Sequence, residues 1–175
     1  MKHMSISYKH FYIILFIYAI TALCGCVKAQ AKESSAPQHK NGGSSMVNAG
    51  NIKEIYLAGG CFWGVEGYFS RITGVLDTDT GYANGKTDKT TYQNLHSSDH
   101  AETVKIRYNS GVIGLDELLE HYFRIIDPLS VNQQGNDKGR QYRTGIYYTD
   151  KADKPVIDAF MQRMQTQYSR PIAVE

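Results

Sequence analysis

Gly59-Gly60-Cys61-Phe62-Trp63-Gly64 is the stretch around which the fold of this chain is organised. Immediately before it, Ile55-Tyr56-Leu57-Ala58 is typical of a β-strand. After it, apolar residues recur at helical spacing at Phe62, Val65, Phe69 and Ile72. The Gly-Gly pair between the two patterns therefore predicts a tight turn from a strand into a helix.

Cys61 is predicted to lie in the first turn of that helix. Unpaired backbone N–H groups and the helix macrodipole stabilise an anion there, so the position favours the reactive thiolate. The helix also carries Gly64 and Gly67, each of which costs about 1 kcal/mol relative to alanine. Such glycines beside a reactive side chain indicate that backbone or substrate approaches closely. A buried structural cysteine is the alternative, and the helix start and the glycines favour a nucleophile over it.

The composition is that of an ordinary globular protein, since the 175 residues suffice for one domain and 42% of them are hydrophobic. The formal charge is +2, but Lys2 and Lys9 lie near the N-terminus, and the chain after residue 25 balances 17 basic against 17 acidic residues. This balance predicts neither a nucleic acid nor an anionic surface as a partner.

The N-terminus has the pattern of a bacterial lipoprotein signal. Lys2 and Lys9 precede an apolar run at residues 11–20, which is too short for a comfortable transmembrane helix. Leu23-Cys24-Gly25-Cys26 follows, so we predict a signal peptide at residues 1–25 and a lipidated Cys26 as the first mature residue. An uncleaved anchor helix is the alternative. The lipoprotein signal and the uncleaved helix both predict a membrane-anchored protein of the bacterial cell envelope that faces the periplasm or the exterior.

Residues 26–51 are rich in Lys, Gln, Ser, Gly and Asn, which predicts a flexible tether to a domain at residues 52–175. Of the three cysteines, Cys24 leaves with the predicted signal and Cys26 carries the lipid, so Cys61 is left alone. We therefore expect no disulfide within the domain. An unpaired thiol in an exported protein indicates a chemical role.

Alternating and helical patterns predict the elements of the domain. Strands are expected at residues 53–58, 74–82, 102–108 and 141–149, and helices at 61–70, 115–126 and 153–168. Residues 83–100 and 128–140 have no regular period and are expected to form polar loops. This order predicts an α+β fold, a two-layer ferredoxin-like split βαβ sandwich with an added C-terminal helix.

Glu102 begins the third predicted strand and shares a face with Val104, Ile106 and Tyr108. That apolar face is the core face, so the pattern places a carboxyl group on the buried side of the sheet. Burial disfavours the ionised form and raises the pKa, which a general acid needs near neutral pH. The alternative is that Glu102 lies just outside the strand in solvent.

An ordered set of motifs resembles the A-type peptide methionine sulfoxide reductases. The set runs Gly60-Cys61-Phe62-Trp63-Gly64-Val65-Glu66, Gly81-Tyr82, Thr91-Tyr92, His100-Ala101-Glu102, Asp127-Pro128, Gln134-Gly135-Asn136-Asp137 with Gly139, and Gln141-Tyr142-Arg143. The resemblance covers about residues 54–174 and makes 52–175 a reductase domain. Members of the family normally continue beyond the segment that resembles residues 171–175, so we expect a C-terminal truncation, with a fragment and one half of a fusion as the open alternatives.

The resemblance implies thiol-dependent reduction of methionine S-sulfoxide, free or in oxidised proteins, by a monomer. Cys61 would be the nucleophile that becomes a sulfenic acid, and Glu102 would donate the proton. The resemblance also implies that Tyr92 and Tyr142 donate hydrogen bonds to the sulfoxide oxygen. It implies that Asp137 helps to orient the site.

Phe62 and Trp63 would form an apolar slot for the methyl group, and Tyr82 is expected only as a candidate for the pocket wall. The resemblance implies neither a metal nor an organic cofactor. Because no second cysteine is available to resolve the sulfenic acid, we expect an external thiol, either a thioredoxin-like partner or a small molecule.

Other kinds of protein share parts of this pattern. A Cys61–His100 dyad for acyl transfer would use distant partners, and no third orienting group is recognisable. The scattered histidines 96, 100 and 121 lack the short spacings of a zinc site. A one-cysteine peroxidase and a non-catalytic lipoprotein that binds oxidised proteins remain as alternatives.

Overall fold

A computed structural model describes residues 51–175. The predicted signal peptide, the lipidation at Cys26 and the tether before Asn51 lie outside these residues and stay predictions. Within residues 51–175, each helix is too short or too polar to cross a membrane.

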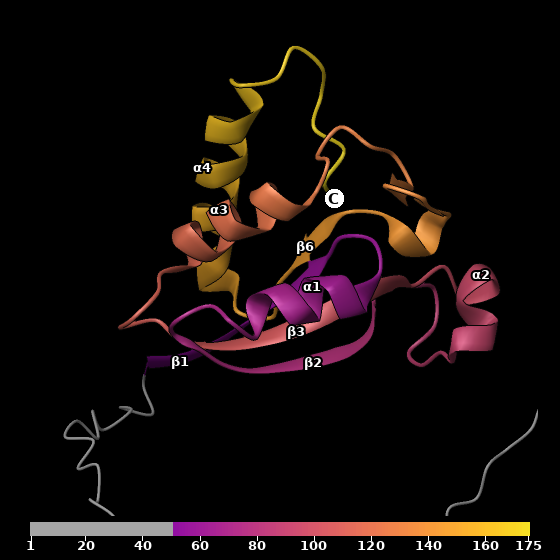
Figure 1. The fold of residues 1–175 in the computed structure, drawn as a ribbon, viewed down its shortest axis with the longest axis horizontal. Coiled ribbons are helices and arrows are strands. Elements are labelled where there is room, and N and C mark those ends of the chain that lie inside the picture. The colour runs from indigo at the N-terminus through magenta and orange to yellow at the C-terminus, as the bar shows by residue number, and fades with distance from the viewer. Residues whose placement is uncertain (1–50) are drawn as a thin grey trace, which may run out of the picture. The chain divides into compact units, whose positions relative to one another are not determined.

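The sheet has four antiparallel strands in the order β2-β3-β1-β6 (Figure 1). They are β1 (Ile52–Ala58), β2 (Val75–Ala83), β3 (Ala101–Asn109) and β6 (Gly145–Tyr147). β1 and β2 are parallel to each other because β3 lies between them and is antiparallel to both. This is the predicted split βαβ arrangement, and the α+β fold class is confirmed.

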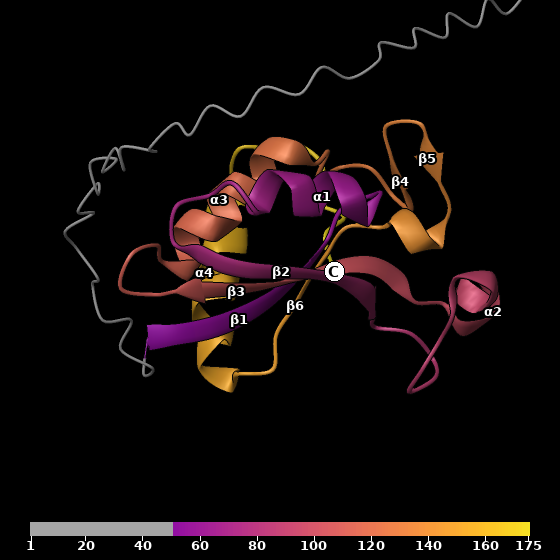
Figure 2. The ribbon, with the colours of Figure 1, turned by 60° about the horizontal axis from the view of Figure 1, so that its bottom comes forward.

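Three longer helices complete the fold. They are α1 (Phe62–Phe69), α3 (Leu115–Ile125) and α4 (Lys154–Gln165). In Figure 2, α1 and α3 lie on the same side of the sheet. The apolar side chains that they turn inward pack against Ile55, Leu57, Val104 and Ile106 of the sheet. The added helix α4 packs on α3, where the Phe123 and Phe160 rings meet edge to face with centroids 5.0 Å apart.

The two predicted loops contain short elements that the sequence pattern did not show. Residues 83–100 include a 3₁₀ turn, η2 (Tyr92–Asn94), and a short helix, α2 (Leu95–Ser98). Residues 128–140 include the two-stranded hairpin of β4 (Gln133–Gln134) and β5 (Asp137–Lys138). Such elements are too short to display a period, so periodicity cannot find them.

The prediction of a strand over residues 141–149 was wrong at both ends. A 3₁₀ turn, η3 (Arg140–Tyr142), takes its first part, and the Tyr142 N–H donates to the Gly139 carbonyl oxygen at 3.0 Å. Another 3₁₀ turn, η4 (Lys151–Asp153), precedes α4, so the last helix begins one residue later than predicted. Gly139 has φ 134°, a conformation that starts the turn and that other residues rarely adopt.

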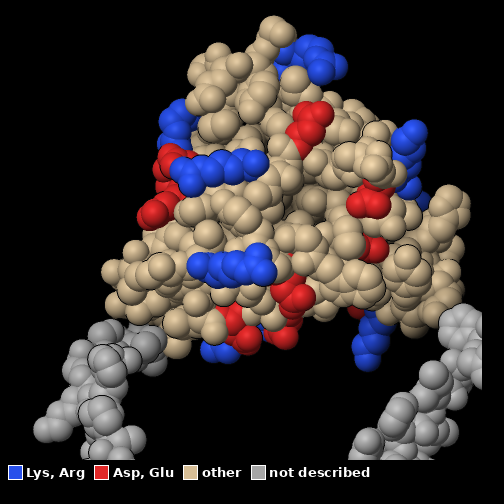
Figure 3. Space-filling view, in the orientation of Figure 1, with Lys and Arg blue, Asp and Glu red and all other residues tan. Residues whose placement is uncertain are grey.

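Charged side chains on the face drawn in Figure 3 lie singly or in small groups of mixed sign. On the face of the sheet away from α1, Lys105 pairs with Asp79 at 2.8 Å, and Arg107 lies 3.6 Å from Glu54. These partners are about a third or more exposed, so each pair contributes little to stability.

Tyr122 of α3 joins the helix layer to two strands. Its buried hydroxyl donates to the Ala58 carbonyl oxygen at 2.5 Å and accepts from the Gly145 N–H at 3.1 Å. Ala58 is the last residue of β1, so this bond fixes the backbone just before the Gly59-Gly60 turn. Tyr108 is equally buried, but within residues 51–175 its hydroxyl has no hydrogen-bond partner.

We predict that Tyr122→Phe destabilises the protein by about 1–3 kcal/mol, since it removes the hydroxyl that bonds the buried Ala58 carbonyl oxygen and the Gly145 N–H. Tyr108→Phe is the matched control and is expected to change the free energy of unfolding little, because it removes a hydroxyl that bonds to nothing. Urea denaturation of both variants measures the difference. Equal losses from the two substitutions would contradict this role of Tyr122.

Candidate active site

Cys61 lies at the end of the sheet where β1 and β2 finish and β3 begins. It is the N-cap of α1 with an extended backbone, and its carbonyl oxygen accepts from the Gly64 N–H at 3.1 Å. Cys61 therefore lies one position before the helix, whereas the sequence predicts it inside the first turn. The thiol is partly exposed at the positive end of the helix.

The two glycines before Cys61 are required by the packing around the turn. A Cβ on Gly59 would lie 2.8 Å from Ile126 Cγ2, and one on Gly60 would lie 2.7 Å from Gln134 Cβ. Gly60 also has φ 84°, a left-handed conformation. A larger residue at either position would push the Cys61 turn away from α3 and from the β4–β5 hairpin.

Gln134 explains part of the motif in residues 127–139. Its side-chain amide pairs with the backbone of Asp127, accepting from the N–H and donating to the carbonyl oxygen at 2.8 Å each. The amide thus ties the hairpin to the end of α3 and holds it against Gly60. No periodic pattern could have predicted this contact, because the partners belong to two irregular segments.

Glu102 is buried on β3, with 2% of its surface exposed, so the alternative of a solvated carboxyl is wrong. Its Oε2 accepts a hydrogen bond from the Phe62 N–H at 3.2 Å. Burial raises the pKa of Glu102 above its usual range, the Phe62 bond opposes this, and the nearby Asp137 carboxylate adds to it. The carboxyl group is therefore biased towards the protonated form directly beside the Cys61 turn.

A cavity of about 420 Å³ brings the predicted residues together. It is lined by all the residues to which catalysis or substrate binding was assigned, and by Tyr82: Cys61, Phe62, Trp63, Tyr82, Tyr92, Glu102, Asp137 and Tyr142. The Phe62 ring lies 5.7 Å from the Trp63 ring and 5.9 Å from the Tyr82 ring, centroid to centroid. Trp63 is 71% exposed, which makes it the solvent-facing edge of this aromatic wall.

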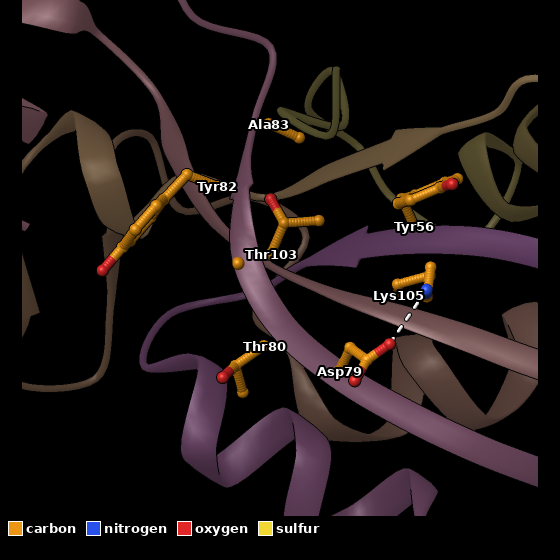
Figure 4. A pocket seen from close by; sticks show the side chains of 8 residues that line it. Tyr56, Asp79, Thr80, Tyr82, Ala83, Thr103 and Lys105 are labelled. Atoms are coloured by element: carbon orange, nitrogen blue, oxygen red, sulfur yellow. Dashed lines mark ion pairs between the residues drawn. The ribbon is translucent and has the colours of Figure 1, made fainter. Parts of the chain in front are cut away.

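Tyr82 has a larger part in the wall than the sequence suggested. It lies directly opposite Glu102 in the β2–β3 register, so both side chains share a face of the sheet. Figure 4 shows another hollow of about 210 Å³ that Tyr82 also lines, together with Tyr56 and the Lys105–Asp79 pair, and the Tyr82 ring points away from that pair. Alternation along β2 and β3 could have identified this pairing.

Tyr92 and Tyr142 reach the cavity from the 3₁₀ turns η2 and η3. Burial, followed by the Glu102 and Tyr92 groups, raises the pKa of Tyr142 above its usual range. Burial and Glu102 act on Tyr82 in the same direction. These two phenols therefore keep their protons at neutral pH and can donate hydrogen bonds.

A cluster around the buried Arg143 supports Tyr142, and nothing in the sequence pattern pointed to it. Arg143 is 5% exposed and donates to the Glu175 carboxylate, as well as to the Asn84 carbonyl oxygen at 2.8 Å. Tyr147 also donates to Glu175, at 2.7 Å. Burial would raise the pKa of Glu175, but the bonds from Arg143, Tyr147 and Asn84 outweigh it and lower the pKa. The carboxylate thus fastens the backbone beside Tyr142 to the end of β2.

The geometry does not support a Cys61–His100 dyad. His100 is buried against Gly85, whose Cβ would lie 2.0 Å from His100 Nδ1, and it lines neither of the cavities that contain Cys61. In the part of the chain that the structure describes, His, Cys, Asp and Glu side chains form no group of three or more that could hold a metal ion.

Comparison with known proteins agrees with this geometry. The family model for peptide methionine sulfoxide reductase matches residues 53–175. The chain is similar to reduced Mxr1 from Saccharomyces cerevisiae, with 36% identity, a TM-score of 0.66, and coverage of 73% of this chain and 76% of that chain. It is also similar to methionine sulfoxide reductase A of Corynebacterium diphtheriae, with 27% identity, a TM-score of 0.63, and coverage of 74% and 66%.

A further similar structure is Mxr1 from Saccharomyces cerevisiae in complex with Trx2, with 28% identity, a TM-score of 0.55, and coverage of 73% of this chain and 76% of that chain. A thiol and a buried acid that share an aromatic cavity on this fold define an oxidoreductase that acts on sulfoxides. The chain belongs to the peptide methionine sulfoxide reductases of the A type, which reduce peptide methionine S-sulfoxide.

We predict that Glu102→Gln slows sulfoxide reduction by about a hundredfold or more, a typical contribution of a positioned general acid.

The same variant is expected to stabilise the protein at high pH. A raised pKa means that the folded protein binds this proton more tightly than the unfolded chain, so wild-type stability falls as the pH rises from near 4.5 through the raised value. Gln cannot ionise and loses nothing over that interval.

Thermal unfolding of the wild type and Glu102→Gln across this pH range measures the effect. The variant should unfold at a higher temperature than the wild type at high pH, with the gap closing below about pH 4. A gap that widens as the pH falls would contradict a raised pKa for Glu102.

Proposed function

We propose that Cys61 reduces methionine sulfoxide by direct attack of its thiolate on the sulfoxide sulfur. The observation that carries this proposal is the single cavity that holds Cys61, Glu102 and the three phenols of Tyr82, Tyr92 and Tyr142. Oxygen passes from the substrate to Cys61, so that one thiol and one sulfoxide yield one thioether and one sulfenic acid. The substrate sulfur is reduced by two electrons and the Cys61 sulfur is oxidised by two.

Glu102 supplies the proton that the sulfoxide oxygen needs as negative charge develops on it. Burial raises the pKa of Glu102, which favours the protonated form of this carboxyl group beside Cys61. Tyr92 and Tyr142 donate hydrogen bonds to the same oxygen and stabilise the charge without proton transfer. Asp137 orients the substrate, since it lines the cavity at the edge formed by β5.

Phe62 and Trp63 form the slot for the substrate methyl group. Their rings, together with Tyr82, make a continuous apolar wall beside Cys61. With the methyl group on that wall and the oxygen on the Glu102 side, only one sulfoxide epimer directs its sulfur at the thiol. The exposed edge at Trp63 gives oxidised methionine on a protein surface access to the slot.

An external thiol returns Cys61 to its reduced form. Cys61 is the only cysteine between residues 51 and 175, so the domain offers no internal thiol to resolve the sulfenic acid. A thioredoxin-like protein is the reductant that we propose, and the similar yeast protein Mxr1 has been crystallised with Trx2. One thiol of the reductant forms a mixed disulfide with Cys61 and water is released. A second thiol then attacks this disulfide and frees the Cys61 thiol.

We predict that one equivalent of a methionine-S-sulfoxide peptide, without added thiol, yields one equivalent of methionine and a sulfenic acid on Cys61. Peptide analysis and mass spectrometry after trapping of the sulfenic acid measure both products. Cys61→Ser should abolish both, whereas Cys24→Ser with Cys26→Ser is the matched control and should retain both. With thiol present, the trapped species should be a mixed disulfide on Cys61.

Full turnover by Cys61→Ser would contradict this mechanism. The R epimer should react far more slowly than the S epimer, and equal rates would contradict the proposed slot. Faster turnover of hydrogen peroxide than of the sulfoxide would favour a one-cysteine peroxidase instead.

A further inference from the structure

A second hollow lies beside Cys61, apart from the aromatic cavity. It measures about 350 Å³ and is lined by the turn before α1, the first turns of that helix, the end of α3 and the β4–β5 hairpin: Gly59, Gly60, Cys61, Gly64, Val65, Ile125, Gln134, Gly135 and Asp137. Only Cys61 and Asp137 line both spaces. The nucleophile thus stands between two hollows with different walls.

The two hollows are suited to different chemistry. The aromatic cavity holds the acid, the phenols and the methyl slot. The second hollow has none of these, because its walls beside Cys61 are glycines, two apolar side chains, the Gln134 amide and Asp137. Its one carboxyl group, Asp137, is shared with the aromatic cavity, whereas Glu102 and the tyrosines do not line it.

Gly64 keeps the second hollow open. A Cβ added there would meet no atom within 4 Å, so the fold does not require glycine at this position, in contrast to Gly59 and Gly60. Glycine inside a helix nevertheless costs about 1 kcal/mol relative to alanine. Gly64 lines the hollow together with Cys61, so a long side chain at this position is the substitution best placed to fill it.

The regeneration step needs such access from a defined direction. Displacement at sulfur proceeds in line, with the attacking sulfur opposite the oxygen that leaves. On the proposed mechanism, which this inference presupposes, the oxygen bound to Cys61 points towards Glu102 and the tyrosines. A thiol that approaches through the aromatic cavity would meet the leaving oxygen first, whereas one in the second hollow faces the back of the S–O bond.

We infer that the second hollow is where the thiol of the protein reductant docks to reduce the Cys61 sulfenic acid. A sulfur–sulfur bond forms between the reductant and Cys61 as the S–O bond of Cys61 breaks. The thiol gives up its proton, the departing hydroxyl group gains one beside Glu102, and water leaves through the aromatic cavity. Substrate and reductant thus use opposite sides of one sulfur atom and need not exchange places.

The test separates the two half-reactions in variants of α1. Gly64→Ala and Gly64→Leu fill the hollow by degrees, and Gly67→Leu is the matched control, because Gly67 lies in the same helix with open space around its Cβ and lines neither hollow. Methionine formed in a single turnover without thiol measures the first half-reaction. The oxidised protein is then mixed with thioredoxin or with dithiothreitol, and loss of the sulfenic acid measures the second.

Gly64→Leu should slow the reaction with thioredoxin by about tenfold or more, since an error of an ångström in the position of reacting atoms can cost a hundredfold. Gly64→Ala should be intermediate, dithiothreitol should be affected less than thioredoxin, and Gly67→Leu should match the wild type. Thermal unfolding should show both leucine variants at least as stable as the wild type, because each removes a helix glycine.

A wild-type rate of sulfenic acid loss in Gly64→Leu with both thiols would overturn the inference. So would a loss of single-turnover methionine formation as large as the loss in the thiol step, since the hollow would then serve the substrate. Failure of the wild type to form methionine in a single turnover is a different result, which would reject the proposed mechanism itself.

Discussion

The hydrogen bond from the Phe62 N–H to the buried Glu102 carboxyl group is the contact on which the site depends. It joins the first residue of α1 to β3, two elements that are distant in sequence and that the sheet brings together at one end. The antiparallel register of β1 and β3, in which Leu57 pairs with Val104, fixes where each strand stops relative to the other. The thiol and the acid therefore line one cavity because of strand pairing, and neither depends on a flexible loop for its position.

The turn that carries Cys61 is held from several sides. Tyr122 fixes Ala58 before the turn, Ile126 packs over Gly59, and Gln134 packs over Gly60 while its amide ties the hairpin to α3. The glycines make this crowding possible, and the local conformational cost of glycine is offset by buried packing around it. Gly64 differs, because nothing in the fold crowds it. The same short segment thus contains two glycines that close packing requires and one, Gly64, that lines the second hollow without such a requirement.

Much of the fold could be predicted from the sequence, because β1, β3, α1 and α3 have clear periods and the faces they bury follow from alternation and helical spacing. The burial of Glu102 followed from the same alternation. The catalytic roles came from the family resemblance, since no pattern distinguishes Tyr92 or Tyr142 from other tyrosines. The ion pair of Arg143 with Glu175 and the hydrogen bonds of the Gln134 amide could not be predicted. They join irregular segments through single side-chain contacts, which produce no periodic pattern in the sequence.

The most direct test of this account is the protonation state of Glu102 in the resting protein. Infrared difference spectroscopy between the wild type and Glu102→Gln isolates the carboxylic acid band of this one residue as the pH is varied. The account predicts that the band persists above pH 4.5, the ordinary value for a glutamic acid, because burial outweighs the Phe62 hydrogen bond. Loss of the band at or below pH 4.5 would show an ionised carboxylate beside the thiol and would contradict its role as the proton donor.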